Sequence, residues 1–371
     1  MICQLHLQNF KCFAYQTLQL KPLTLLSGLN SSGKSSVLQA LVLLRQSYQQ
    51  GLLPEKGLAL NGDLVHIGTA QDALFEGAEK DIIGFGLTLE NGQEKEWLFN
   101  YDREADVLGL TSPISQTDGI YKSNLFGHHF HYLQAERLGP RRFFETSDFL
   151  VRQQRQLGVS GEYTAHFLAI FGREDIQPEL ARADASSLNL IDQVEAWLEE
   201  VSPGTRVVLT SNAATDTVSL QYSFLMGTQR SKDYRATNVG FGITYILPIL
   251  VAVLSSSPGA LLLLENPEAH LHPRGQAMMG ELLARAAACG VQIIVETHSD
   301  HVLNGIRVAV HNGKLKPDDV QLHYFQRRNQ DGLAEVISPN MDRNGRIDRW
   351  PEGFFDEWDK SLEALLEPGK E

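Results

Sequence analysis

The strongest constraint on the fold is an eight-residue segment, GLNSSGKS, that joins an apolar run to a helical pattern. Gly28 to Ser35 fit GxxxxGK[ST] without a mismatch. Leu23 to Leu26 before the segment are typical of a buried strand, and apolar residues after it recur at helical spacing. Glycines let backbone N–H groups turn inward, and the start of a helix adds its positive dipole end. The segment therefore predicts a phosphate-binding loop, with a chance glycine-rich turn as the competing interpretation.

Such a loop predicts ATP as the ligand and Mg²⁺ as its companion ion. Lys34 is expected to neutralise the β- and γ-phosphates, and the Ser35 hydroxyl is expected to coordinate Mg²⁺, a hard cation that takes oxygen ligands. The residues expected to surround the phosphates are Gly28, Leu29, Asn30, Ser31, Ser32, Gly33, Lys34, Ser35 and Ser36.

The second half of such a site is an acidic residue at the end of an apolar strand, which LLLLENPEAHLHP supplies. Glu265 is the expected metal-orienting carboxylate. Asn266 follows it, and an amide cannot accept the proton from an attacking water. Another group must then act as general base, or hydrolysis is slow. Glu268 is the first alternative, although a carboxylate that complements a helix dipole is an equally good interpretation of this residue.

A third polar group follows the apolar run Val291 to Val295, in the segment IIVETHSDH. His298 lies just beyond this strand, which is expected to neighbour the strand that ends at Glu265. An imidazole there can hydrogen-bond the γ-phosphate or the attacking water. We therefore predict Glu265, Glu268 and His298 as the catalytic group, with Ser35 and Glu265 at the metal.

Periodicity along the rest of the chain predicts an α/β fold. Alternating leucines open the chain as strands, Asn91-Gly92 marks a hairpin, and a second hairpin is expected over 207–222. Residues from about 150 to 200 favour helices. Near the end, VQLHYFQ and LAEVIS flank a turn at Gln330-Asp331-Gly332, and FFDEWDKSLEALL predicts an amphipathic helix.

Bulk composition limits the location and the partners. The 371 residues carry a net charge of −13, so nucleic-acid binding would need a local basic patch. The three cysteines are scattered and suggest neither a disulfide framework nor a zinc ribbon, which fits a reducing cytoplasm. The start lacks the pattern of a signal peptide, and the most apolar stretch, 243–264, is interrupted by Pro248 and by SSSPG. We expect no membrane span.

Taken together, the loop, ENPEAHLHP and ETHSDH resemble the ABC-like P-loop ATPases of the SMC/RecF/OLD group. AERLGPRR, NVGFGITYILPI and GRIDRWPEGFFDEW extend the similarity to a small branch of stand-alone prokaryotic ATPases, similar to Septu-type and retron-associated defence ATPases. The resemblance implies a single ABC-like head over 1–371 with a central mostly parallel sheet, an antiparallel β subdomain and a helical lobe. Lobe I would comprise about 1–130 plus 245–371, with the helical, signature-bearing lobe, about 131–244, inserted.

In this group a glycine-containing signature at a helix start contacts the γ-phosphate that the opposite subunit holds. The matching segment here is Asn238-Val239-Gly240-Phe241-Gly242, so the resemblance assigns nucleotide contacts to Asn238, Gly240 and Gly242. It departs from the usual serine-glycine-glycine form, and a tight helix-entry turn that serves packing alone is the alternative. Gln71 is a weaker match to the glutamine that senses the γ-phosphate.

The resemblance also implies a homodimer that sandwiches ATP between two heads and controls a separate effector, such as a nuclease, in DNA repair or phage defence. DNA is a possible further partner. The alternatives are a nucleotide-gated binding module that does not hydrolyse ATP and, less favoured, a nuclease of the OLD type. Missing heptads argue against a long-armed SMC protein.

Two clusters of charged or titratable residues have simpler interpretations. Arg137, Arg141 and Arg142 form the strongest basic cluster, and pairing with the protein's own carboxylates is the leading interpretation of it. The histidines at 128, 129 and 131, and those at 270 and 272, are expected to be structural or to lie at an interface rather than to bind zinc.

Overall fold

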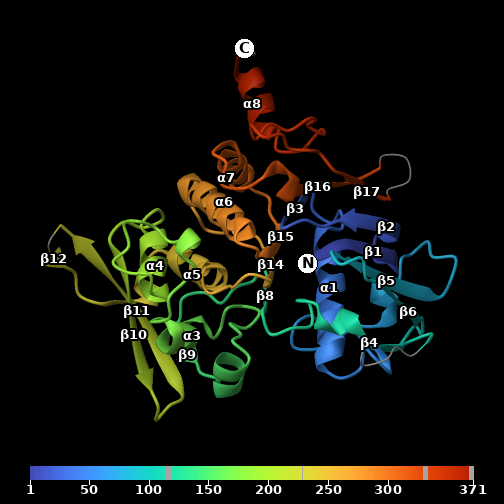
Figure 1. Ribbon diagram of the computed structural model, residues 1–371, viewed down its shortest axis with the longest axis horizontal. Helices are drawn as coiled ribbons and strands as arrows, with labels where there is room; N and C mark the ends of the chain where they lie inside the picture. Colours follow the sequence, from blue (N-terminus) through green and yellow to red (C-terminus); the bar gives the residue numbers. More distant parts are fainter. Residues whose placement is uncertain (113–117, 228, 329–332, 367–371) are drawn as a thin grey trace, which may run out of the picture.

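A six-stranded sheet forms the centre of the computed structural model, which describes residues 1–112, 118–227, 229–328 and 333–366 (Figure 1). Its strand order is β17-β16-β3-β15-β14-β8, and every neighbouring pair is parallel except β16 with β17. The strands are β3 (Leu23–Gly28), β8 (Phe130–Leu133), β14 (Leu261–Glu265), β15 (Gln292–Glu296), β16 (Val320–Arg327) and β17 (Ala334–Ile337). The carboxyl ends of β3, β14 and β15 therefore meet at one edge of the sheet.

Both faces of this sheet are covered, which explains why its central strands are uninterrupted apolar runs. Side chains alternate between the faces with a period of two. Leu261 and Leu263 pack into one hydrophobic cluster, whereas Leu262 and Leu264 pack into the other. All four leucines are fully buried. The strands expected from the apolar runs before Gly28, Glu265 and Glu296 are thus confirmed.

An antiparallel sheet and the first helix cover one face of the central sheet. The order of this sheet is β2-β1-β5-β6, and Asn91-Gly92 joins β5 to β6 as the expected hairpin. Its strands are β1 (Ile2–Phe10), β2 (Phe13–Gln19), β5 (Ile82–Leu89) and β6 (Glu94–Asn100). Helix α1 (Lys34–Gln49) shares a hydrophobic core with these strands. The chain between α1 and β5 forms β4 (Gly57–Ala59) and the short α2 (Ala70–Ala73), and β7 (Val107–Gly109) follows β6.

Helices α5, α6 and α7 cover the opposite face (Figure 1). Their bounds are Phe241–Leu254, Pro273–Ala288 and Asp300–His311. Helix α5 runs through Pro248 and ends at Leu254, so the apolar stretch 243–264 divides into a buried helix, a turn and the buried strand β14. Among the described residues, no helix is both long and apolar enough to cross a bilayer.

The segment between β8 and α5 forms a lobe beside α5 (Figure 1). It contains α3 (Thr164–Phe171), α4 (Leu190–Leu198), β9 (Phe144–Glu145), β10 (Thr205–Asn212), β11 (Thr217–Met226), β12 (Gln229–Arg230) and β13 (Tyr234–Arg235). The second expected hairpin is β10 with β11, which are paired antiparallel. The lobe boundary expected near residue 131 falls within β8, which continues in the central sheet to Leu133.

The WPEGFF block, Trp350 to Phe355, anchors the C-terminal segment to the central sheet. Phe354 is fully buried, and its ring packs edge-on against Tyr324 of β16 at 5.4 Å between centroids. The Tyr324 hydroxyl donates to the backbone oxygen of Glu352 at 3.0 Å, and the Arg307 guanidinium lies over the Trp350 ring. Beyond the block, α8 (Glu357–Leu366) is the expected terminal helix and extends away from the body (Figure 1). The turn expected at 330–332 lies outside the described residues.

Candidate nucleotide site

The GLNSSGKS segment joins the end of β3 to the start of α1, as its pattern predicts. Gly28 has a φ of 137°, and a Cβ there would lie 2.0 Å from the backbone oxygen of Phe325. Gly33 caps α1 with a φ of 108°, and a Cβ there would lie 2.6 Å from Cys12 Sγ and 2.6 Å from the Phe13 ring. Only glycine therefore fits at either end of the loop. Helix α1 begins directly after Gly33, and the start of a helix favours an anion.

Lys34 is the first residue of α1, and its side chain folds back into the loop. It is only 3% exposed. Its ammonium donates to the backbone oxygens of Gly28 at 3.0 Å and Leu29 at 2.7 Å. Burial lowers the pKa of Lys34, and the nearby Glu296 carboxylate opposes that shift. The cation is thus fixed at the loop, where it can neutralise phosphate charge.

A cavity of about 410 Å³ lies against this loop. Asn30, Ser31, Ser32, Gly33, Lys34, Ser35 and Ser36 line it, together with Lys11, Cys12, Gln39, Glu296 and His298. Of the contacts expected at residues 28–36, residues 30–36 are therefore gathered around one hollow, together with His298, whereas Gly28 and Leu29 are not among its described lining residues. Burial lowers the pKa of His298 and Lys34 lowers it further, while Glu268 opposes this shift, so the net effect favours the neutral imidazole.

Two glutamates end neighbouring strands at the site, and only one of them was expected. Glu265 and Glu296 are direct partners in the register of β14 with β15. Glu265 accepts from the Tyr132 hydroxyl at 2.8 Å and from the Ala135 N–H at 3.0 Å. Glu296 accepts from the Ser35 hydroxyl at 3.2 Å. The carboxylate beside the predicted metal-binding serine is therefore Glu296, which sequence reasoning missed although it lies in ETHSDH.

Asn266 and Glu268 lie at the turn after β14. Asn266 has a φ of 45°, and its side-chain oxygen is buried without a hydrogen-bond partner in the described chain. Glu268 accepts from the Thr297 hydroxyl and from the His298 N–H, both at 2.8 Å. The described lining of the cavity includes neither Glu268 nor Glu265. Glu268 thus fixes the segment that carries His298.

Arg137 has a different role from the one expected. We expected carboxylate partners, but its guanidinium donates to backbone carbonyls at the end of β14 and beside it. The distances are 2.6 Å to Glu265 O, 2.6 Å to Asn266 O, 3.1 Å to Gln134 O and 3.2 Å to Tyr245 O. Arg137 is 2% exposed, whereas Arg141 and Arg142 are exposed. The cluster is therefore one buried clamp on the Glu265–Asn266 backbone and two surface cations.

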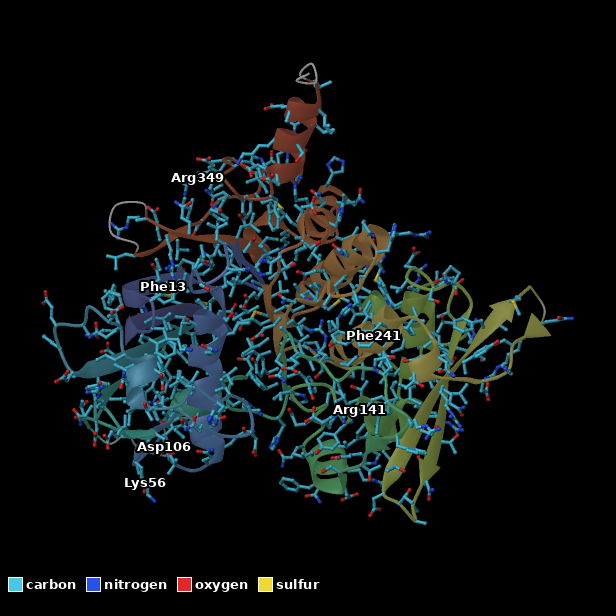
Figure 2. The ribbon with its side chains drawn as sticks, turned by 180° about the vertical axis from the view of Figure 1, so that it is seen from behind. Phe13, Lys56, Asp106, Arg141, Phe241 and Arg349 are labelled. Atoms are coloured by element: carbon cyan, nitrogen blue, oxygen red, sulfur yellow. The ribbon has the colours of Figure 1, made fainter. Side chains whose placement is uncertain are left out.

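The signature-like segment lies at the start of α5, where Gly240 is the N-cap. Asn238, Gly240 and Gly242 line a cavity of about 580 Å³ with His270 and His272. A Cβ on Gly242 would lie 2.5 Å from His270 O, so the close approach of α5 to the segment that carries His270 requires glycine. Within the described residues this cavity shares no lining residue with the cavity at the loop. Phe13, whose ring lies near Gly33 of the loop, and Phe241, the first residue of α5, lie on different sides of the molecule in Figure 2.

Gln71 belongs to α2, is exposed, and accepts from Arg103 at 3.0 Å. The described lining of the loop cavity contains a different glutamine, Gln39 of α1, which accepts from the Lys11 ammonium at 2.7 Å. Neither Lys11 nor Gln39 was predicted. The two residues come together because the turn between β1 and β2 lies close to the loop. This contact depends on the fold, and no local sequence pattern reveals it.

The described residues fit Mg²⁺ at this place. Ser35 offers a hydroxyl, and Glu296, which also lines the cavity, has a second carboxylate oxygen that is buried without a hydrogen-bond partner among the described residues. Mg²⁺ takes oxygen ligands of these kinds and retains some water. Beside the loop it would supply positive charge to the β- and γ-phosphates.

Comparison with known proteins supports the same fold. The structure is similar to SmcHead bound to the C-winged helix domain of ScpA, at 15% identity and a TM-score of 0.55, covering 92% of this chain and 98% of that chain. It is also similar to the Smc head domain with an extended coiled coil bound to the C-terminal domain of ScpA from Pyrococcus furiosus, at 13% identity and a TM-score of 0.53, covering 99% of both chains. The fold is thus that of an SMC-type ATPase head. No curated protein sequence matches significantly.

Two family models match the sequence. One, described as "Protein of unknown function (DUF3696)", covers residues 315–365 and so includes the WPEGFF block and most of α8. The other covers residues 23–304, from the strand before the loop to the helix after His298, and therefore spans most of the chain. Together with the SMC-type head, this match makes the chain an ABC-like P-loop ATPase, and it belongs to the family described as "AAA domain, putative AbiEii toxin, Type IV TA system".

Proposed function

We propose that this chain binds ATP with Mg²⁺ at Gly28–Ser36 and hydrolyses it slowly. The observation that carries the proposal is the loop itself, in which Lys34 is buried against Gly28 and Leu29 at the mouth of a cavity lined by Ser35 and His298. Backbone N–H groups, one cation and one hydroxyl are the chemistry that a Mg²⁺-bound triphosphate requires.

Slow hydrolysis follows from the groups available to accept a proton. Asn266 cannot act as a base. Glu268 carries a carboxylate, but both of its oxygens already accept hydrogen bonds from Thr297 and His298. In this proposal Glu268 orients His298 toward the γ-phosphate, Glu265 supports the end of β14, and water is activated inefficiently.

The same two features, the amide at Asn266 and the two occupied oxygens of Glu268, favour a second candidate, a nucleotide-gated module with negligible turnover. Steady-state phosphate release by the purified protein, compared with Lys34→Ala and Glu268→Gln, separates the two. We expect the wild type to exceed both variants. Equal rates in all three proteins would contradict hydrolysis and favour the gated module.

We further propose that two copies close around two ATP molecules. Asn238, Gly240 and Gly242 line a cavity at the start of a 14-residue helix, and this cavity is separate from the loop of the same chain. A helix N-terminus suits a γ-phosphate held by another copy, and a two-fold arrangement would use both surfaces twice. Native mass measurement with Mg²⁺ and a non-hydrolysable ATP analogue tests this. A monomer at micromolar concentration would contradict it.

The closed dimer would control a partner. The SMC heads of similar fold are described bound to ScpA, and the family description names a toxin–antitoxin system. We propose a separate effector protein, such as a nuclease, in DNA repair or phage defence, with DNA as a possible further ligand. A pull-down with Lys34→Ala as the control tests this, since a nucleotide-gated partner should be recovered with the wild type alone.

A further inference from the structure

The ends of β14 and β15 place two carboxylates side by side, but their surroundings differ. Both oxygens of Glu265 are engaged, one by the Tyr132 hydroxyl and the other by the Ala135 N–H. This carboxylate faces β8 and the segment that follows it. The described lining of the loop cavity does not include Glu265.

Glu296 faces the loop instead. It lies on β15, the strand between β14 and β3, and lines the cavity together with Ser35 and Lys34. One of its oxygens accepts from Ser35 at 3.2 Å, and the other is buried without a hydrogen-bond partner in the described chain. The residue is only 6% exposed. A buried carboxylate oxygen without a partner is unfavourable unless a cation or donor completes it.

Lys34 does not complete it, because its ammonium donates to the backbone oxygens of Gly28 and Leu29. A cation between Glu296 and Ser35 would satisfy the free oxygen and contact the hydroxyl at the same time. It would also lie at the loop, where the phosphates of a nucleotide supply its remaining ligands.

We propose that Glu296, rather than Glu265, is the carboxylate that holds the Mg²⁺ of the bound nucleotide together with Ser35. Glu265 is then a positioning residue that fixes the end of β14 against β8. This inference rests on the proposed function, because it assumes that a nucleotide binds at Gly28–Ser36.

The test measures the affinity for a fluorescent ATP analogue with Mg²⁺ and with EDTA, so it does not depend on turnover. Glu296→Gln removes the charge while keeping the shape. Glu265→Gln makes the same change on the neighbouring strand. Glu90→Gln is the control variant, because the Glu90 side chain is exposed and lies far from Glu296 in the sequence. Thermal unfolding of each variant verifies that it is folded.

We expect Mg²⁺ to tighten binding to the wild type and to Glu90→Gln. Glu296→Gln should lose about 10- to 100-fold of that Mg²⁺-dependent gain, the range found when metal sites lose a supporting group, while its affinity in EDTA is unchanged or higher. Glu265→Gln should retain most of the gain. The proposal is overturned if Glu296→Gln keeps the full gain, or if Glu265→Gln alone loses it. A wild type that binds the analogue in neither condition would overturn the proposed function and this inference with it.

Discussion

Replacing Arg137 by methionine should destabilise the protein far more than any other change in the basic cluster. The guanidinium is buried and donates to four backbone oxygens, two of them at 2.6 Å. Burial lowers the pKa of Arg137 to about 10, so the group remains charged at pH 7. Methionine retains most of the volume and removes every donor.

The magnitude follows from the two short bonds, to Glu265 O and Asn266 O. A hydrogen bond from a charged donor contributes about 1.5–3 kcal/mol, so the two short bonds together contribute about 3–6 kcal/mol. Part of this is offset because methionine avoids the cost of burying a charge. We therefore expect a loss of about 3–5 kcal/mol, a large part of the roughly 5–15 kcal/mol that stabilises a typical domain. Because Asn266 holds a φ of 45°, the turn beside the site should also relax.

Urea unfolding followed by tryptophan fluorescence measures the effect. Arg142→Met is the matched control, since Arg142 is exposed and belongs to the same cluster. Its unfolding free energy should change by no more than about 0.5 kcal/mol. If Arg137→Met and Arg142→Met unfold at the same urea concentration, the clamp contributes nothing and the reasoning is wrong.

Three further predictions concern the loop, the site carboxylate and the C-terminal block. Gly33→Ala should abolish nucleotide binding in a fluorescence titration, because its Cβ would meet Cys12 and Phe13, whereas Gly109→Ala, with nothing within 4 Å, should not. Burial and the neighbouring Glu265 carboxylate raise the pKa of Glu296 from 4.5 to about 7. The folded protein therefore favours the neutral carboxyl group, and this contribution to the free energy of unfolding is fully present below pH 4.5 and is lost as the pH rises through 7. The melting temperature of Glu296→Gln should therefore rise relative to that of the wild type as the pH is raised from 5 to 8. A difference in melting temperature that does not change with pH would refute the raised pKa of Glu296. Phe354→Ala should cost about 3–5 kcal/mol in chemical unfolding because that ring is fully buried, while Leu366→Ala, at an 85% exposed residue, should be nearly silent.

Local pattern determined much of this protein. GLNSSGKS after an apolar strand specified the loop, because its glycines are needed wherever φ is positive and the backbone is crowded. Uninterrupted leucines before Glu265 specified a strand covered on both faces, and Asn91-Gly92 specified a hairpin. Each of these signals depends on residues close together in the chain, so the sequence alone contains it.

Only the tertiary structure decided how the polar groups are shared. Glu265 and Glu296 both end apolar strands, and no pattern states which of them faces Ser35, since that depends on the sheet order β3-β15-β14-β8. Arg137 was expected to pair with a carboxylate, but the fold brings its guanidinium to the backbone carbonyls of β14. Long-range contacts of this kind arise when strands distant in the chain pair at one edge. Their partners are therefore fixed by packing and by the need to satisfy buried polar atoms.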